Sequence, residues 1–222
     1  MNKRRTWLVM ILWAVTFAAI SQAHQSPGNK WETEIKKFEA SDRQNPPPKD
    51  AVLFIGSSSI RLWQSLTEDF PGIKVINRGF GGSEIADSTF YVDRIVIPQQ
   101  PKIVVLYAGD NDLASGKTPQ QVFEDYKTFV GRIHQNLPRT KIAFISIKPS
   151  PARASLLQSM KDANSLIKAY ATHDKRLIYV DVFTPMLGKD GGPRPELFGP
   201  DRLHMNSAGY GLWKLVVAPY IR

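Results

Sequence analysis

Three consecutive serines follow a short apolar run, and their position suggests nucleophilic chemistry. Residues 51–55 have the composition of a buried strand, and Gly56 separates them from the serines at 57–59. A strand that turns directly into a helix presents a side chain at the carboxyl edge of a sheet, beside the free N–H groups of the helix start. Ser58 is therefore a candidate nucleophile. The alternative is that the serines only cap the helix.

Residues near the other end of the chain could complete a site for acyl transfer. Such a site needs a nucleophile, a base, a group that orients the base, and donors for the oxyanion. His204 can accept the Ser58 proton because imidazole titrates near neutral pH. Asp201 precedes His204 by three residues, so its carboxylate can bond the far ring nitrogen. The alternative is a loop that merely precedes a helix. The other histidines are interpreted as surface or core residues: His24, His134 and His173.

Two further positions offer donors for an oxyanion. The sequence places glycines at 79, 81 and 82 after the second predicted strand, where the backbone must approach something closely or adopt a positive φ. The N–H groups of Ser58 and Gly82 and the side-chain amide of Asn111 could together stabilise negative charge. The alternatives are a simple glycine turn and an asparagine that bonds its own backbone.

Alternating strands and helices must position these groups. The apolar runs predict strands at 51–55, 73–76, 102–107, 141–147 and 176–182. Amphipathic patterns predict helices between and around them, beginning with one marked by Trp31, Ile35 and Phe38. A short helix is predicted from the serine turn to about Leu66, and another begins at Ser83. This alternation predicts a three-layer α/β/α domain with a five-stranded parallel sheet. Ligands bind outside the carboxyl ends of such strands, where the candidate residues fall.

The first 23 residues have the pattern of a signal peptide. A basic start at 3–5 precedes an apolar run at 7–20 that is short for a membrane span, and small residues at 21 and 23 predict cleavage after Ala23. The alternative is an uncleaved anchor. Residues 24–49 are interpreted as a leader and a helix packing on the domain, and residues 50–222 as the catalytic domain. We expect an exported protein, periplasmic or secreted, without stable membrane insertion after cleavage.

Composition narrows the function classes. The sequence has no cysteine, which excludes thiol redox chemistry and cysteine-based zinc sites. Its 29 basic and 20 acidic residues give a net charge of +9, but the basic residues form no dense tract, so we do not predict nucleic-acid binding. The positive net charge suggests that the protein acts close to anionic envelope polymers or lipid head groups. The oligomeric state cannot be read from the sequence.

Four blocks of this sequence resemble the SGNH hydrolases, also called the GDSL esterase/lipase family. Residues 56–58 match the Gly-Asp-Ser block, and residues 77–82 match an Asn-x-Gly-x-Gly-Gly run. Residues 109–112 match Gly-x-Asn-Asp, and residues 201–204 match Asp-x-x-His. The blocks occur in the family's order over about residues 50–220. The chain most resembles the small acetylhydrolases similar to platelet-activating-factor acetylhydrolase.

This resemblance implies a flavodoxin-like fold and a Ser-His-Asp triad, with no metal and no cofactor. It implies Ser58 as nucleophile, Gly82 and Asn111 as oxyanion donors, His204 as base and Asp201 as its partner. One departure concerns Ser57, which stands where the family has aspartate. A hydroxyl thus replaces a carboxylate that supports the turn, although Ser58 keeps the family register.

The function predicted from the sequence is that of an exported serine esterase. It would hydrolyse short-chain esters, acetyl above all, of a carbohydrate or lipid. One alternative is an O-acyltransferase that uses the same site. A second is a non-catalytic flavodoxin-like module that binds phosphate or a mononucleotide at the serine turn. A phosphate site has no need of Asp201 and His204 at the far end of the chain.

Overall fold

Five parallel strands form the central sheet of the computed structural model, which describes residues 30–222. The strands are β1 (Val52–Gly56), β2 (Val75–Gly79), β3 (Ile103–Tyr107), β4 (Lys141–Ile145) and β5 (Leu177–Val180). Their order across the sheet is β2-β1-β3-β4-β5, and every neighbouring pair is parallel. The predicted three-layer α/β fold is confirmed. The predicted signal peptide, its cleavage point and residues 24–29 lie outside the described part of the chain.

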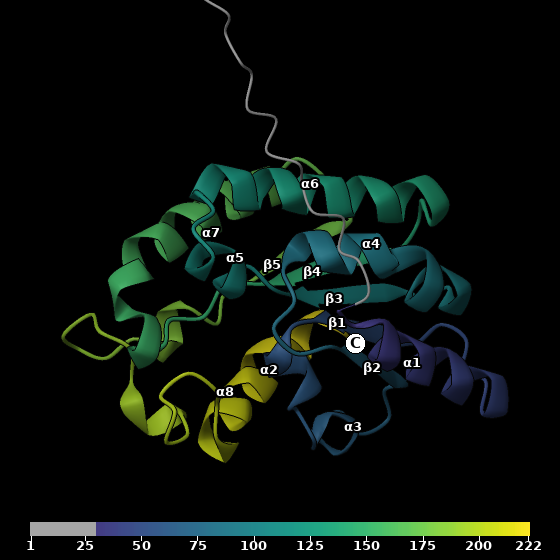
Figure 1. The fold of residues 1–222 in the computed structure, drawn as a ribbon, viewed down its shortest axis with the longest axis horizontal. Helices are drawn as coiled ribbons and strands as arrows, with labels where there is room; N and C mark the ends of the chain where they lie inside the picture. The colour runs from purple at the N-terminus through teal and green to yellow at the C-terminus, as the bar shows by residue number, and fades with distance from the viewer. Residues whose placement is uncertain (1–29) are drawn as a thin grey trace, which may run out of the picture.

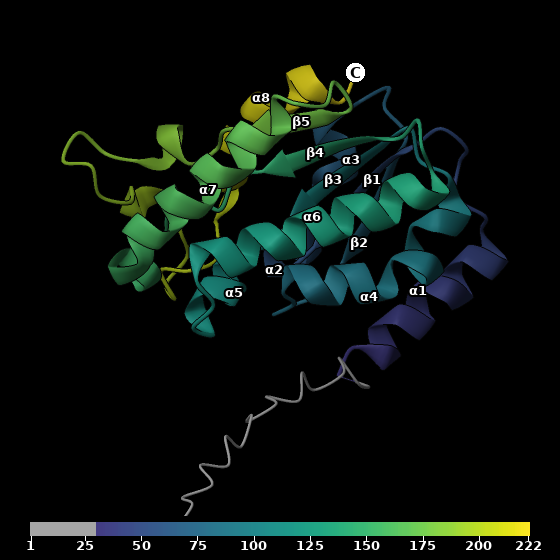
Figure 2. The same cartoon turned by 90° about the horizontal axis from the view of Figure 1, so that it is seen from above.

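Helices cover both faces of this sheet (Figures 1 and 2). They are α1 (Glu32–Gln44), α2 (Ser58–Arg61), α3 (Leu66–Asp69), α4 (Ile85–Ile95), α5 (Asp110–Ala114), α6 (Pro119–Asn136), α7 (Leu157–Ala171) and α8 (Ser207–Val217). Short 3₁₀ segments are η1 (Ile97–Gln99), η2 (Pro151–Leu156), η3 (Thr184–Met186), η4 (Pro195–Leu197) and η5 (Ala218–Tyr220). Helices α1, α4, α6 and α7 bury their apolar sides in one core cluster, and α2, α3 and α8 contribute to the other.

Strand residues alternate between these two cores, as period-two geometry requires. Leu53 and Ile55 of β1 pack on the side of α4 and α6, whereas Val52 and Phe54 pack on the side of α8. Both faces of β1 are buried, which explains its continuous apolar run.

The register brings the carboxyl ends of three strands together. Gly56, which ends β1, is level with Gly79 of β2 and Tyr107 of β3. Gly56 has φ +132°, and a Cβ atom there would lie 1.8 Å from the Tyr107 carbonyl oxygen. Only glycine fits this position. The serine turn, the glycine-rich loop and the segment after β3 therefore leave the sheet side by side.

Several element boundaries differ from those expected. The helix predicted from the serines to about residue 66 is two short helices, α2 and α3, separated by a turn at residues 62–65. Helix α4 begins at Ile85, not at Ser83, because Glu84 and Asp87 form a reciprocal capping box. Strand β4 ends at Ile145, two residues earlier than expected.

Helix α1 and the residue before it pack against the domain close to the glycine-rich loop. Trp31 and Ile35 are buried in the core, and the Trp31 indole N–H donates to the Gly81 carbonyl at 2.9 Å. Arg94 of α4 pairs with Glu32 and Glu39 of α1. None of the helices within residues 30–222 combines the length and the apolar character needed to cross a membrane.

Candidate active site

Ser58, His204 and Asp201 form a continuous hydrogen-bonded chain. His204 Nε2 lies 3.0 Å from Ser58 Oγ, and His204 Nδ1 lies 2.6 Å from Asp201 Oδ2. An ionised carboxylate only accepts hydrogen bonds, so Nδ1 carries the ring proton and the Nε2 lone pair faces the hydroxyl. The structure thus brings together all three residues that the sequence proposed for nucleophile, base and orienting acid.

The Asp201 carboxylate is held by its own loop as well as by the imidazole. Its Oδ1 accepts the backbone N–H groups of Leu203 and His204, each at 3.0 Å. Arg202, which follows Asp201, has φ +58°, and this turns the loop back toward the carboxylate. The hydrogen bonds from the Leu203 N–H and from His204 lower the pKa of Asp201 to about 2, so the group that orients the imidazole stays ionised near neutral pH.

Only one of the three serines faces this imidazole. Ser57 is the N-cap residue of α2, but it makes no capping hydrogen bond through its side chain. Ser57 and Ser59 are buried, and their hydroxyls have no hydrogen-bond partner among the described residues. Ser58 is half-buried and lines a cleft. The interpretation of the serines as side-chain caps therefore does not hold, and Ser58 is the one placed to react.

Two residues of the cleft, Ser58 and Gly82, have backbone N–H groups without a hydrogen-bond acceptor among residues 30–222. The N–H of Ser58 is at the first position of α2, where no intrahelical acceptor exists. Gly82 has φ +76°, and no acceptor bonds its N–H within the described part of the chain. A side chain at this φ would be strained, which accounts for glycine.

The third predicted donor, Asn111, lies on α5 and lines the same cleft. Its Nδ2 donates to the Ser83 carbonyl at 3.0 Å, and its Oδ1 accepts from Arg153 Nη2 at 2.8 Å. The amide does not bond its own backbone, so the turn interpretation is wrong. One hydrogen on Nδ2 remains available, because a primary amide carries two.

A buried cluster of charged side chains contacts Asn111 through Arg153. No pattern in the sequence predicted this cluster. Asp110 Oδ2 lies 2.9 Å from Lys148 Nζ and 3.1 Å from Arg153 Nη1. Lys148 also donates to the Tyr107 hydroxyl at 3.2 Å. Burial alone would raise the pKa of Asp110, but Lys148 and Arg153 hold it below its ordinary value. Lysine and arginine after a strand form no recognisable local motif, so nothing in the sequence pointed to them.

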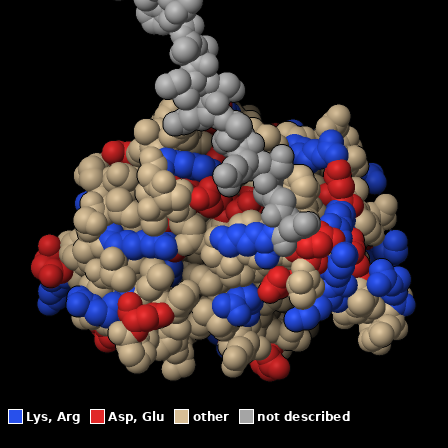
Figure 3. Space-filling model, in the orientation of Figure 1, with Lys and Arg blue, Asp and Glu red and all other residues tan. Residues whose placement is uncertain are grey.

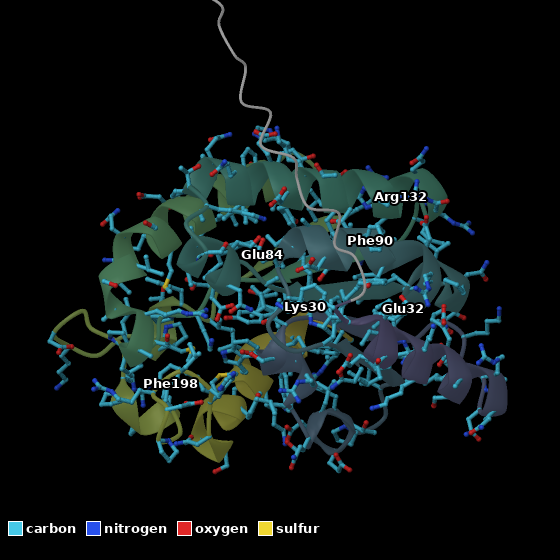
Figure 4. The ribbon with its side chains drawn as sticks, in the orientation of Figure 1. Lys30, Glu32, Glu84, Phe90, Arg132 and Phe198 are labelled. Carbon is cyan, nitrogen blue, oxygen red and sulfur yellow. The ribbon has the colours of Figure 1, made fainter. Side chains whose placement is uncertain are left out.

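The cleft above Ser58 has a volume of about 550 Å³ and is lined by both polar and apolar groups. Lys30, Glu34 and Arg61 contribute charged side chains, and Trp31 and Leu203 are its larger apolar residues. Figure 4 shows Lys30 beside the start of α1, toward the middle of the molecule. The charged side chains offer groups that can orient a polar substrate in this cleft.

Metal-ligating clusters are not part of this arrangement. Within residues 30–222, no three His, Asp or Glu side chains gather in a way that could hold a metal ion. The acidic residue nearest the imidazole, Asp201, is engaged by the imidazole and two backbone N–H groups.

Solved structures share this fold at low sequence identity. A candidate acylhydrolase from Bacteroides fragilis is 22% identical with a TM-score of 0.76, and the match covers 87% of this chain and 98% of that one. A GDSL-like lipase from Bacteroides thetaiotaomicron is 22% identical with a TM-score of 0.71, covering 84% and 96%. A catalytic mutant of an acetylxylan esterase from Geobacillus stearothermophilus is 16% identical with a TM-score of 0.62, covering 79% and 95%.

No curated protein matches the sequence. Residues 55–212, by contrast, match the GDSL-like lipase/acylhydrolase family, and this segment contains Ser58, Gly82, Asn111, Asp201 and His204. The match extends over more than half of the chain, and the solved structures agree with it in fold. The protein is a hydrolase that belongs to the GDSL-like lipase/acylhydrolase family.

Proposed function

We propose that this protein is a serine esterase that removes short acyl groups, acetyl above all, from a hydrophilic ester. The observation that carries the proposal is the hydrogen-bonded chain from Ser58 through His204 to Asp201, of which Ser58 and His204 line a cleft. The family supplies hydrolase chemistry, and the acetylxylan esterase among the structural neighbours supports an acetyl ester of a carbohydrate as the substrate class.

In the proposed acylation step, His204 Nε2 takes the proton as Ser58 Oγ attacks the ester carbonyl carbon. The carbonyl oxygen becomes an oxyanion, which the N–H groups of Ser58 and Gly82 and the Asn111 amide stabilise. Asp201 stabilises the imidazolium that forms. The imidazolium then gives its proton to the departing alcohol, and an acyl-enzyme ester remains on Ser58.

In the proposed deacylation step, His204 activates a water molecule. The water attacks the acyl carbon, the same donors stabilise the second oxyanion, and Ser58 regains its proton as the acid leaves. The His204 side chain is 34% exposed and that of Asp201 is 51% exposed. Water therefore reaches the base directly, as the deacylation step requires.

The alternative of a phosphate-binding module receives less support. Helix α2 has four residues, too short for a strong helix dipole, and the Ser58 hydroxyl is already engaged by His204. Export is part of our proposal and depends on the sequence of residues 1–23 alone. N-terminal sequencing of the protein purified from the cell envelope or medium should begin at His24, and an intact Met1 would contradict export by cleavage.

The experiment that tests the proposal compares Ser58→Ala with Ser59→Ala. Substrates are p-nitrophenyl esters of increasing acyl length and acetylated xylo-oligosaccharides. We expect Ser58→Ala to lose turnover by ~10⁶-fold with an unchanged melting temperature. Ser59→Ala removes a neighbouring buried hydroxyl and should keep wild-type turnover. Normal hydrolysis by folded Ser58→Ala would falsify the assignment, and acylated sugar accumulating in place of free acid would favour the transferase.

A further inference from the structure

The loop after β4 contacts both parts of the catalytic site, through Arg153 on one side and Ala152 on the other. Arg153 lies on the oxyanion side. Its guanidinium donates to Asn111 Oδ1 at 2.8 Å and approaches Asp110 Oδ2 at 3.1 Å. In the same segment, η2, the Ala152 N–H donates to the Arg202 carbonyl at 3.0 Å. Arg202 directly follows Asp201, and its positive φ shapes the loop that carries Asp201 and His204. The short segment η2 thus contacts both Asn111, the proposed oxyanion donor, and the loop that carries Asp201 and His204.

We propose that Arg153 is a positioning residue that fixes the orientation of the Asn111 amide for oxyanion stabilisation. This inference rests on the proposed esterase function. An amide can rotate by half a turn and exchange its oxygen for its nitrogen. Arginine has only donors, so it can donate to Oδ1 but cannot form a hydrogen bond with Nδ2. Arg153 therefore holds Nδ2 on the side of Ser83 and the cleft, and Asp110 fixes Arg153 in turn.

The test is a double-mutant cycle on p-nitrophenyl acetate hydrolysis. Arg153→Met alone should lower kcat by ~10–100-fold with KM within about threefold, because the amide is lost only as a transition-state donor. Asn111→Ala should lower kcat by ~10²–10³-fold. The double variant should match Asn111→Ala within about threefold, since Arg153 acts through that amide. Arg153→Lys should rescue only part of the loss, because an ammonium lacks the planar fork.

Arg132→Met is the matched control, because Arg132 pairs with Asp93 on the surface of α6 (Figure 4) and should leave kcat unchanged. Multiplicative losses in the double variant, or unchanged kcat in folded Arg153→Met, would overturn the positioning role. These outcomes are distinct from failure of the esterase proposal, which would show as full activity in Ser58→Ala. Melting temperatures of every variant separate loss of fold from loss of turnover.

A second feature lies at the opposite edge of the sheet. A hollow of about 840 Å³ is formed by segments that precede β1, β3 and β4, at the amino ends of strands whose carboxyl ends carry the catalytic residues. Five basic side chains line it, together with one carboxylate: Lys49, Lys102, Arg139, Lys141, Arg222 and Asp50. All six residues are exposed, and no ion pair involves any of them within the described part of the chain.

Such a concentration of charge is unusual for this surface. The described residues hold 26 basic and 20 acidic side chains, an excess of six, and this hollow alone has an excess of four. On the face shown in Figure 3, by contrast, basic and acidic side chains are interspersed. Some surface cations, such as Arg132 and Lys127, have carboxylate partners, which the cations of the hollow lack within the described part of the chain. The cations of the hollow are therefore available to an external anion.

We infer that this hollow binds a linear polyanion, a chain with repeated carboxylate or phosphate groups. The cations of this concave site come from several segments of the chain, so they can contact a polymer strand from more than one side. A flat membrane surface would contact only the cations at the edge of the hollow. Binding there leaves the catalytic cleft open, because the two sites lie at opposite ends of the strands. The protein could thus remain attached to an anionic polymer while it hydrolyses neighbouring esters.

The test measures binding of fluorescent oligogalacturonate and of polyphosphate by anisotropy at 50 mM and 300 mM salt. We expect binding at low salt that weakens as salt rises. Replacing Lys102, Arg139 and Lys141 with Gln should weaken it at least about 10-fold and leave p-nitrophenyl acetate hydrolysis unchanged. The matched control replaces Lys127, Lys161 and Lys189 with Gln. Equal loss in the control, no binding to either polymer, or binding only to vesicles of 30% phosphatidylglycerol would overturn this inference.

Discussion

The Tyr210 hydroxyl donates to the Ser59 carbonyl at 3.0 Å, which fastens α8 to α2. Helix α8 follows the loop that carries His204, and α2 begins at Ser58. Ser58 and His204 are 146 residues apart in sequence, yet their side chains meet at 3.0 Å. The bond from Tyr210 is buried, so it fixes the distance between the two elements from inside the core, away from the cleft.

Removing this bond should therefore affect turnover as well as stability. We expect Tyr210→Phe to lower kcat by ~3–10-fold and stability by about 1 kcal/mol, since a buried carbonyl loses its partner. Tyr220→Phe, at an exposed tyrosine, is the control and should change neither. Steady-state kinetics and urea unfolding measure the two effects. A stability loss with unchanged kcat would show that α8 positions His204 without this bond.

Asn111→Ala should weaken stabilisation of the oxyanion. We expect kcat to fall by ~10²–10³-fold, the range for one donor, with little change in KM. Asn136→Ala on the exposed end of α6 is the control, and p-nitrophenyl acetate hydrolysis is the measurement. An unchanged kcat in Asn111→Ala would mean that the backbone N–H groups of Ser58 and Gly82 are sufficient.

The lowered pKa of Asp201 predicts how acid affects stability. Its folded-state pKa of about 2 lies below the ordinary value of 3.8, so the unfolded chain binds more protons between these values. The stabilisation is therefore present above about pH 4 and lost as pH falls through about 2. Because the side chain is half exposed, we expect less than about 1 kcal/mol.

Asp201→Asn tests this pH dependence. The variant should melt below the wild type at pH 7, and the difference should shrink between pH 4 and pH 2. Differential scanning calorimetry at pH 7, 5, 4, 3 and 2 follows it. A difference that stays constant over this range would show that the Asp201 carboxylate has no such role in stability.

The buried Lys148–Asp110 pair should matter for stability more than an exposed pair. Lys148→Met leaves Asp110 buried with Arg153 as its remaining cation, and we expect a loss of about 3 kcal/mol. Lys214→Met, which breaks a surface pair with Asp69, should cost less than about 1 kcal/mol. Urea unfolding compares the two. Similar losses would mean that Arg153 alone compensates the Asp110 charge.

Much of the fold followed from the order of apolar runs and turns. Alternating strands and helices determined a parallel sheet, and the carboxyl ends of the strands are where the candidate residues lie. The helix boundaries near the site were less predictable, because the start of α4 depends on a capping box formed by Glu84 and Asp87. The preference for Ser58 over its neighbours came from the family register, and the structure adds that only Ser58 faces His204.

The parts of the site that were missed are those held by long-range contacts. Arg153 reaches Asn111 across 42 residues, and Trp31 reaches Gly81 across 50. Neither contact follows from a local pattern, because arginine and tryptophan in these positions are equally compatible with surface and core roles. Three-dimensional packing decides which neighbours such side chains find.

Covalent labelling with a fluorophosphonate, followed by peptide mass spectrometry, tests the central claim most directly. The account predicts a single adduct on Ser58 in the wild type and none on Ser57 or Ser59. Labelling should be abolished in Ser58→Ala and strongly slowed in His204→Ala. An adduct on any other residue, or active protein that takes no label, would contradict the assignment of Ser58 as the nucleophile.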